Sequence, residues 1–336
     1  MRATRCGLHR SPRREVHCRA HTPRCILAPM DDRPALTSSD QSRAVGETLR
    51  DAARDCLTEA RAAIVDGRKS EAEAVHDFRR AMKRWRALLR LLGAFVGPEA
   101  RSLRDEARDL AGELSGARDG QSALDALADL EKHELALSTR SLAQVRRRID
   151  EIRSDAETTL DGDMRLRLGG ALDRAEAAVA QWPLAMVTFE ALADELARNY
   201  RAARALLPAD WQAAAAEELH ELRKRVVIHR YQMEMVEPLW PRFMKMWTGE
   251  AQRLRDRLGK HQDLLVLANL TAPHQTLARW RSRLAPAIAA RKAAHVAGAE
   301  RIAARLFLER PKEVRRRLVG LWRTAGADEM ADAATM

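Results

Sequence analysis

The sequence has few of the residues that interrupt helices or build sheets. Glycine and proline supply only 16 and 12 of its 336 residues, and aromatic side chains make up only 4%. Alanine, leucine, arginine and glutamate dominate instead, and all four favour helices. Because β-branched and aromatic residues favour strands, their scarcity argues against a fold based on sheets. We therefore predict an all-α protein.

Cysteine is also scarce, and three of the four cysteines lie in the first 25 residues, leaving only Cys56 in the rest of the chain. This excludes a disulfide framework and favours a reducing compartment. The three N-terminal cysteines alternate with histidines, but their spacing fits no known zinc pattern. We predict that residues 1–43 form a disordered basic tail, or that translation starts at Met30.

Long apolar runs are missing as well. No stretch approaches the ~18 consecutive apolar residues that a membrane-spanning helix needs, and the first residues lack the apolar core of a signal peptide. We therefore expect no membrane span and a cytoplasmic location.

The net charge of +11 is unevenly distributed. Residues 1–29 hold seven arginines and one glutamate, so the tail carries more than half of the excess. Residues 30–336 therefore carry only a small excess of positive charge. If this charge matters for function, it must be clustered on particular surfaces.

The apolar periodicity predicts a series of helices in two halves, 44–182 and 183–325, which meet at Trp182-Pro183. The predicted helices of the first half are 44–67, 70–92, 98–114, 119–135 and a stretch over 139–180 broken at Gly162, Gly169 and Gly170. Those of the second half are 189–207, 213–236, 242–258 and 262–270, with two or three more in 274–322. Proline and glycine mark most of the expected ends.

One internal repeat supports this division. VHDFRRAMKRWR at 75–86 aligns with LHELRKRVVIHR at 219–230, a shift of 144 residues. The same shift aligns ELSGARD at 113–119 with RLGKHQD at 257–263. Two matches at one offset predict a duplicated helical unit.

The stretch 70–92 carries a cationic face. On a wheel of 100° per residue, five basic residues fall within about 80° of His76, opposite the apolar residues. These are Arg79, Arg80, Lys83, Arg86 and Arg90. Asp77 is the only acid between Glu73 and Glu99. An ordinary solvated face would carry acidic partners one turn away, so the pattern favours a bound anion.

Neighbouring segments supply further basic residues. The next predicted helix carries Arg101, Arg104 and Arg108 on one side, and antiparallel packing would place them along a groove shared with the first cationic face. The second half keeps His220, Arg223, Lys224 and Arg230, and Lys245, Arg255 and Lys260 follow on the next helix. Val227, Ile228 and Glu234 replace three cations, so we expect a weaker second half. His229 lies on the apolar face, as a core histidine would.

At these residues the sequence resembles the CHAD family, the histidine-containing α-helical domain. HDFRRAMKRWR and HELRKRVVIHR are similar to its paired His-x-x-Arg-Lys/Arg signature, and VGETLR, NYRAAR, LSGARD and LGKHQD fit its layout over about 44–322. The resemblance implies two helical bundles related by pseudo-twofold symmetry, with a basic central groove or pore that binds inorganic polyphosphate. It also implies association with polyphosphate granules and binding through the histidines and cations of both signature helices.

We therefore expect non-catalytic binding of inorganic polyphosphate, without cofactor or metal, and with other phosphate-rich polyanions as alternative partners. An enzyme is a weaker hypothesis, because phosphate hydrolysis usually needs carboxylates that hold a metal and the cationic face has none. Glu71-Ala72-Glu73 matches a triphosphate-hydrolase motif only by accident, at a helix start. Nucleic-acid binding is a further alternative, although the cationic face carries no exposed aromatic residues for base stacking. Arg80 and Lys224 stand at i+4 from the two histidines, which argues against a metal pair.

Overall fold

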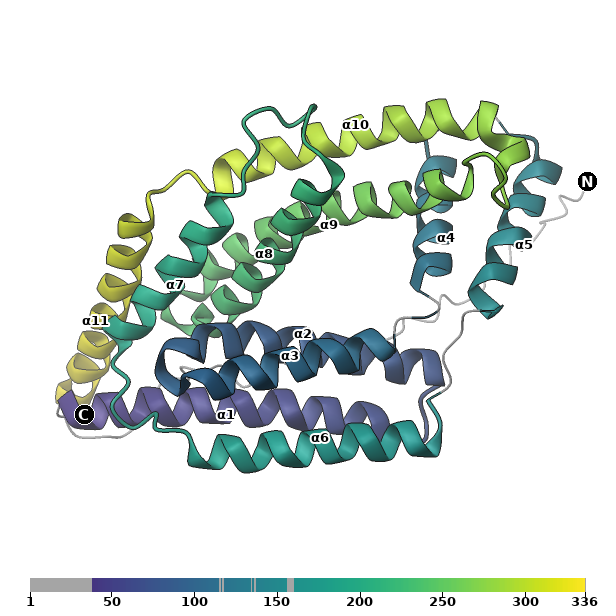
Figure 1. The fold of residues 1–336 in the computed structure, drawn as a ribbon. Coiled ribbons are helices and arrows are strands. Elements are labelled where there is room, and N and C mark those ends of the chain that lie inside the picture. Colours follow the sequence, from purple (N-terminus) through teal and green to yellow (C-terminus); the bar gives the residue numbers. More distant parts are fainter. Residues whose placement is uncertain are drawn as a thin grey trace, which may run out of the picture.

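The computed structural model describes residues 38–114, 116, 118–133, 135, 137–155 and 160–335. In this part of the chain it contains eleven α helices, two short 3-10 helices and no strand (Figure 1). The helices are α1 (Ser38–Val65), α2 (Glu71–Val96), α3 (Pro98–Glu113), α4 (Arg118–Glu131), α5 (Thr139–Asp155), α6 (Gly162–Gln181), α7 (Phe189–Arg204), α8 (Ala216–Met235), α9 (Pro241–Leu270), α10 (Arg281–Leu306) and α11 (Pro311–Thr335). The predicted all-α class is confirmed.

Local sequence signals fix both ends of α2. The Ser70 hydroxyl accepts a hydrogen bond from the Glu73 N–H at 3.3 Å, and the Glu73 carboxylate accepts one from the Ser70 N–H at 3.0 Å. This reciprocal capping box satisfies two backbone donors. At the other end Gly97, with φ of 80°, separates α2 from Pro98 at the first position of α3. Glu73 thus lies at a helix start, as predicted.

Three of the predicted helix breaks are wrong. The stretches 242–258 and 262–270 form one uninterrupted helix, α9, which contains Gly259. Gly169 and Gly170 lie inside α6. A glycine inside a helix costs only about 1 kcal/mol relative to alanine, so the packing of the surrounding helix outweighs it.

The first helix begins earlier than expected. It starts at Ser38 and so includes the last residues of the predicted tail, 38–43. Residues 1–37, with Met30 and the three N-terminal cysteines, lie outside the described residues, and the prediction of a disordered tail stays a prediction.

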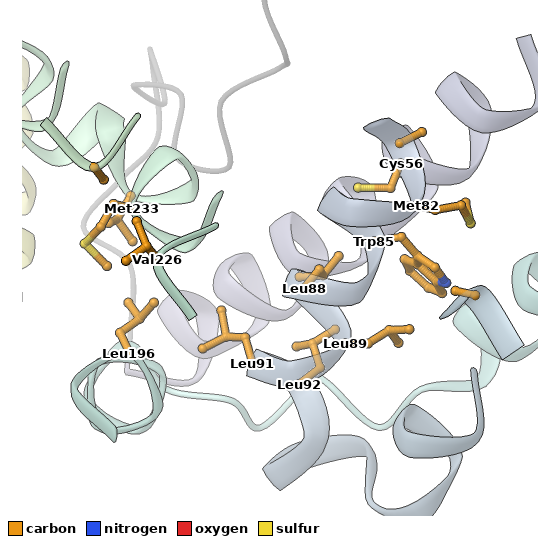
Figure 2. Packing of buried hydrophobic residues seen from close by; sticks show 14 of the residues in the cluster. Cys56, Met82, Trp85, Leu88, Leu89, Leu91, Leu92, Leu196, Val226 and Met233 are labelled. Carbon is orange, nitrogen blue, oxygen red and sulfur yellow. The ribbon is translucent and has the colours of Figure 1, made fainter. Parts of the chain in front are cut away.

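A large apolar core joins helices from both predicted halves. It takes side chains from α1, α2, α3 and α6 and from α7, α8, α9 and α11. Figure 2 shows Leu91 of α2 near Leu196 of α7, with Val226 and Met233 of α8 beyond them. A smaller core lies between α4, α5, the end of α9 and the start of α10. Each predicted half therefore contributes to both cores, and the division at 182/183 stays a prediction.

The expected seam between the halves is itself part of the large core. Trp182 is buried and stacks on Trp85 of α2, with ring centroids 5.8 Å apart. Its indole N–H donates to the Glu99 carboxylate at 3.1 Å. Trp182 thus anchors the segment that connects α6 to α7.

The order of the helices follows the shift of 144 residues found in the sequence. At this shift α1 overlaps α7, α2 overlaps α8, α5 overlaps α10 and α6 overlaps α11, while α3 and α4 together overlap α9. The neighbours correspond as well, since α1 packs on α2 and α6 as α7 packs on α8 and α11.

The two sets of helices differ where α3 ends. The chain turns after α3, and α4 packs against α9 instead of extending α3 (Figure 1). Because α2 also packs against α8, the helices α2, α4, α8 and α9 surround a common space. None of the helices in the described part of the chain is long and apolar enough to cross a membrane.

Candidate functional site

A pocket of about 680 Å³ lies between α2, α4, α8 and α9. Its wall contains eight basic or histidine side chains from five helices: His76, Arg79 and Lys83 of α2, Arg118 of α4, Arg153 of α5, Arg223 of α8, and Arg255 and Lys260 of α9. We call this space the interhelical pocket. Six of these residues were predicted from the sequence, and Arg118 and Arg153 were not.

The amphipathic pattern of α2 directs its cations into the pocket. Phe78, Met82 and Trp85 are buried in the large core on one side of the helix. The pocket residues of α2 occupy the opposite side, where His76 and Lys83 are exposed to it. Burial of the apolar face therefore fixes the direction of the basic face.

Arg79 connects the pocket to the end of α3. Its guanidinium donates hydrogen bonds to the carbonyl oxygens of Ala111 at 2.5 Å and Leu114 at 2.9 Å. These carbonyls lie at the helix C-terminus, where a cation is electrostatically favourable. Arg79 thus has a structural role at the turn into α4, in addition to lining the pocket.

Lys83 is the pocket group with the most cationic surroundings. It forms no ion pair with any described residue, although it opens onto the pocket. Burial by the surrounding helices, together with four nearby arginines, lowers the pKa of Lys83 to about 8. The arginines are Arg255, Arg118, Arg79 and Arg223, in decreasing order of effect. Burial and the neighbouring cations thus destabilise the charged form, and a bound anion would stabilise it.

Arg223 occupies on α8 the position that Arg79 has on α2, but its contacts differ. It lies over Gly259 of α9, where an added Cβ would sit 3.4 Å from its Nη2 atom. Its Nε atom is buried without a hydrogen-bond partner among the described residues. Burial and the nearby Arg255 and Arg118 lower its pKa. Gly259 therefore lets the guanidinium lie against a continuous helix.

Acidic side chains also reach the pocket, and the protein's own groups hold most of them. Asp256 accepts from Gln252 at 2.8 Å and from Arg255 at 2.8 Å, and Asp125 accepts from Gln121 at 2.9 Å. Burial raises the pKa of Asp263. The pocket is therefore mixed in charge, and its least neutralised part lies around Lys83.

The structure contains a buried ion network on the pocket wall that was not predicted from the sequence. Asp129 of α4 accepts hydrogen bonds from Arg291 at 2.6 Å, His295 at 2.8 Å and Lys260 at 3.2 Å. Although burial opposes the charged form, these bonds hold the pKa of Asp129 well below its usual range. We call these four residues the Asp129 network. Its only sequence signal is an acid on the otherwise apolar face of α4.

Other predicted residues of the cationic face lie outside the pocket. Arg86 and Arg90 follow Lys83 on α2, and the charge of Arg104 on α3 acts on both. Burial, then Arg108 and Arg104, lower the pKa of Arg86. Arg108 is exposed and pairs with Asp109 at 3.0 Å and Asp105 at 3.3 Å, and Arg101 is exposed on α3.

Four other predicted residues pair with acids close to them in the sequence. Arg80 pairs with Asp77 at 3.2 Å and Lys245 with Glu237 at 3.7 Å, while Lys224 contacts Glu221 and Arg230 contacts Glu234. His220 lines no part of the pocket, and burial lowers its pKa. The second signature helix thus gives the pocket Arg223 alone.

His229 is a core residue, as predicted. It is fully buried, and its Nε2 atom accepts a hydrogen bond from the indole of Trp247 at 2.9 Å. Burial lowers its pKa to about 3, which keeps the ring neutral. Within the described residues no three His, Cys, Asp or Glu side chains are grouped so that they could hold a metal ion.

The fold and the pocket define an all-α protein in which basic side chains from several helices converge on one cavity. The CHAD domain model matches residues 47–272, and the chain belongs to the CHAD domain family. The predicted resemblance is confirmed.

Two solved structures are similar to this chain. PptA from Streptomyces chartreusis is 18% identical with a TM-score of 0.53, covering 83% of this chain and 99% of its own. The CHAD domain from the plant Ricinus communis is 19% identical with a TM-score of 0.48, covering 80% and 91%. At these identities the likeness concerns the fold alone. No curated protein matches the chain significantly.

Proposed function

We propose that this protein binds inorganic polyphosphate in the interhelical pocket, without catalysing a reaction, and thereby associates with polyphosphate granules. The observation that carries the proposal is the environment of Lys83. Four arginines from four helices act on this lysine, and no described carboxylate pairs with it. A bound anion would relieve this repulsion.

A linear phosphate chain suits the chemistry of these groups. Each internal phosphate offers about one negative charge and two acceptor oxygens, which an arginine can bind through two parallel hydrogen bonds. The basic groups come from helices on several sides of the pocket, so one anion with several phosphates can contact more of them than a single phosphate can. Polyphosphate is also the ligand that the family resemblance implies.

The proposal includes an internal duplication with a basic central groove. The correspondence of helices at a shift of 144 residues supports the duplication. Under this proposal the pocket is part of the groove, and α2 and α4 of the first predicted half enclose it together with α8 and α9 of the second. The turn after α3 makes the contributions of the two halves unequal.

The acidic groups of the pocket favour binding over catalysis. Hydrolysis of phosphate chains usually needs a metal held by carboxylates or a positioned base. Asp129 is occupied by Arg291, Lys260 and the imidazole of His295, and Asp256 by Arg255. These carboxylates are therefore committed to protein contacts.

The test is a titration of labelled long-chain polyphosphate with the wild type and two double variants. Lys83→Gln with Arg223→Gln removes two pocket cations, and should weaken binding by at least about 100-fold because each charge-assisted contact contributes about 1.5–3 kcal/mol. Arg147→Gln with Arg148→Gln removes two exposed cations of α5. This pair should change the affinity for polyphosphate by less than twofold. Equal effects of the two pairs would contradict the pocket assignment.

Competition separates polyphosphate from nucleic acid as the ligand. We expect long-chain polyphosphate to displace labelled single-stranded DNA at a far lower phosphate concentration than the reverse. Preferential retention of DNA would overturn the proposed ligand. Release of phosphate from polyphosphate by purified protein with Mg²⁺ would overturn the non-catalytic part.

A further inference from the structure

A partly buried carboxylate on the wall of the interhelical pocket, that of Asp263, lacks an ion pair. It belongs to α9 and interacts with the hydroxyl of Ser122 on α4. It forms no ion pair with any described residue, whereas Asp129 and Asp256 on the same wall each pair with an arginine. Asp263 thus brings into the pocket a negative charge that the protein does not neutralise by direct contact.

Two arginines of the pocket act on this carboxylate from other helices. Burial raises the pKa of Asp263, and the charge of Asp125 adds to this effect. The interaction with Ser122 and the charges of Arg223 on α8 and Arg118 on α4 oppose it. Burial lowers the pKa of Arg223, and the charge of Asp263 opposes that change in turn. The acid and the two arginines are therefore close enough to interact electrostatically inside one pocket.

The contacts of Arg223 argue against the view that Asp263 holds this arginine in position. The Nε atom of Arg223 is buried without a hydrogen-bond partner among the described residues. Its guanidinium lies over Gly259, which leaves room for it on the surface of α9. The packing of the helices therefore places Arg223, and the carboxylate acts on it through charge alone.

A phosphate group that Arg118 and Arg223 bind must come close to Asp263, because the charges of both arginines already act on that carboxylate. Like charges repel, and the repulsion is stronger in a partly buried site than in water. We propose that Asp263 limits the affinity of the interhelical pocket for polyphosphate by repelling the phosphate groups that these two arginines attract. This inference rests on the proposed function and adds to the pocket an unfavourable element that keeps binding reversible.

The sign of one substitution tests the inference. Asp263→Asn removes the charge and keeps the size of the side chain, so the affinity for labelled long-chain polyphosphate at neutral pH should rise by at least about tenfold. The plot of log affinity against log salt concentration should become steeper by about one unit, since the pocket gains one net positive charge. Asp51→Asn makes the same change of charge at an exposed residue of α1 and should alter the affinity by less than twofold.

An affinity that stays unchanged or falls in Asp263→Asn would overturn the inference, since an acid that positions the arginines gives this result. If Lys83→Gln with Arg223→Gln still weakens binding, the proposed function stands. Failure of the wild type to bind long-chain polyphosphate would instead overturn the proposed function itself. Circular dichroism shows whether each variant is folded. If Asp263→Asn does not fold, Asp263→Ser removes the same charge and should strengthen binding in the same way.

Discussion

At the scale of single residues, the charge of Lys83 depends on its neighbours. The groups that face it from the surrounding helices are Arg79, Arg118, Arg223 and Arg255. With a pKa of about 8, Lys83 is charged in the free protein below that pH and neutral above it. A bound polyanion favours the charged form and raises the pKa again. Binding above pH 8 is therefore coupled to the uptake of a proton.

We accordingly expect the affinity for long-chain polyphosphate to be level below about pH 8 and to fall as the pH rises above it, because the free protein must then be reprotonated on binding. Titrations at constant ionic strength across this range measure the effect. Lys83→Arg is the matched control, since arginine stays charged throughout, and its affinity should vary much less. The same decline in both proteins would show that Lys83 is not the responsible group.

At the scale of secondary structure elements, the turn between α3 and α4 shapes the pocket. At the shift of 144 residues, the segment that overlaps α3 and α4 is one continuous helix, α9. The hydrogen bonds from Arg79 to Ala111 and Leu114 hold the end of α3, where helix carbonyls lack partners within the helix. The position of α4, and with it the width of the pocket, depends on this end.

Arg79→Ala should therefore destabilise the protein as well as weaken binding. Loss of the two hydrogen bonds leaves acceptors unsatisfied, at a cost of about 1–3 kcal/mol in the free energy of unfolding. Urea unfolding measures this cost in the absence of ligand. Lys83→Gln removes a pocket cation without such bonds and should not destabilise the fold. A stability equal to wild type in Arg79→Ala would contradict the structural role.

The packing of α4 on α5 depends on Gly120. An added Cβ there would lie 2.6 Å from the Cβ atom of Arg153 and 2.7 Å from its Cα atom. Gly120→Ala should lower the free energy of unfolding by about 1–3 kcal/mol, as overpacking does. Gly249→Ala in α9, where nothing lies within 4 Å, should instead raise it by roughly 0.5–1 kcal/mol. Thermal unfolding measures both effects. Melting temperatures that shift from the wild-type value in the same direction in both variants would contradict the close packing at Gly120.

At the scale of the whole molecule, the Asp129 network joins α4 to α9 and α10. Asp129 is 6% exposed and contacts Lys260 of α9 and both Arg291 and His295 of α10. The smaller core lies beside these contacts and includes residues of the same helices. The pocket wall is therefore held by polar and apolar contacts together.

Asp129→Asn should destabilise the protein by about 3–5 kcal/mol, because it leaves the largely buried Arg291 without its counter-charge. Asp129 stabilises the fold fully above the usual carboxyl pKa of about 4, and this stabilisation is lost as the pH falls further. The difference in the free energy of unfolding between Asp129→Asn and wild type should therefore narrow in acid. Chemical unfolding at several pH values measures both effects. Asp125→Asn, an exposed position on α4, should stay within about 0.5 kcal/mol of wild type.

Periodicity and composition were enough to predict most helices and the direction of the basic face of α2. Phe78, Met82 and Trp85 define the buried side, and the cations follow on the other. The helix breaks within α9 and α6 were predicted wrongly, because glycine in a helix is a weak signal that tertiary packing outweighs. The Asp129 network had no pattern to reveal it, since its members are far apart in the sequence.

The sequence by itself determined the all-α class, the helix faces and the family, because each depends on local periodicity or on a motif within a few turns. Only the tertiary structure decided which cations share a cavity. Arg80 and Lys224 lie beside pocket residues in the sequence yet pair with nearby acids, whereas Arg118 joins the pocket from another helix. Convergence of charge depends on how helices cross, and a single helix does not encode it.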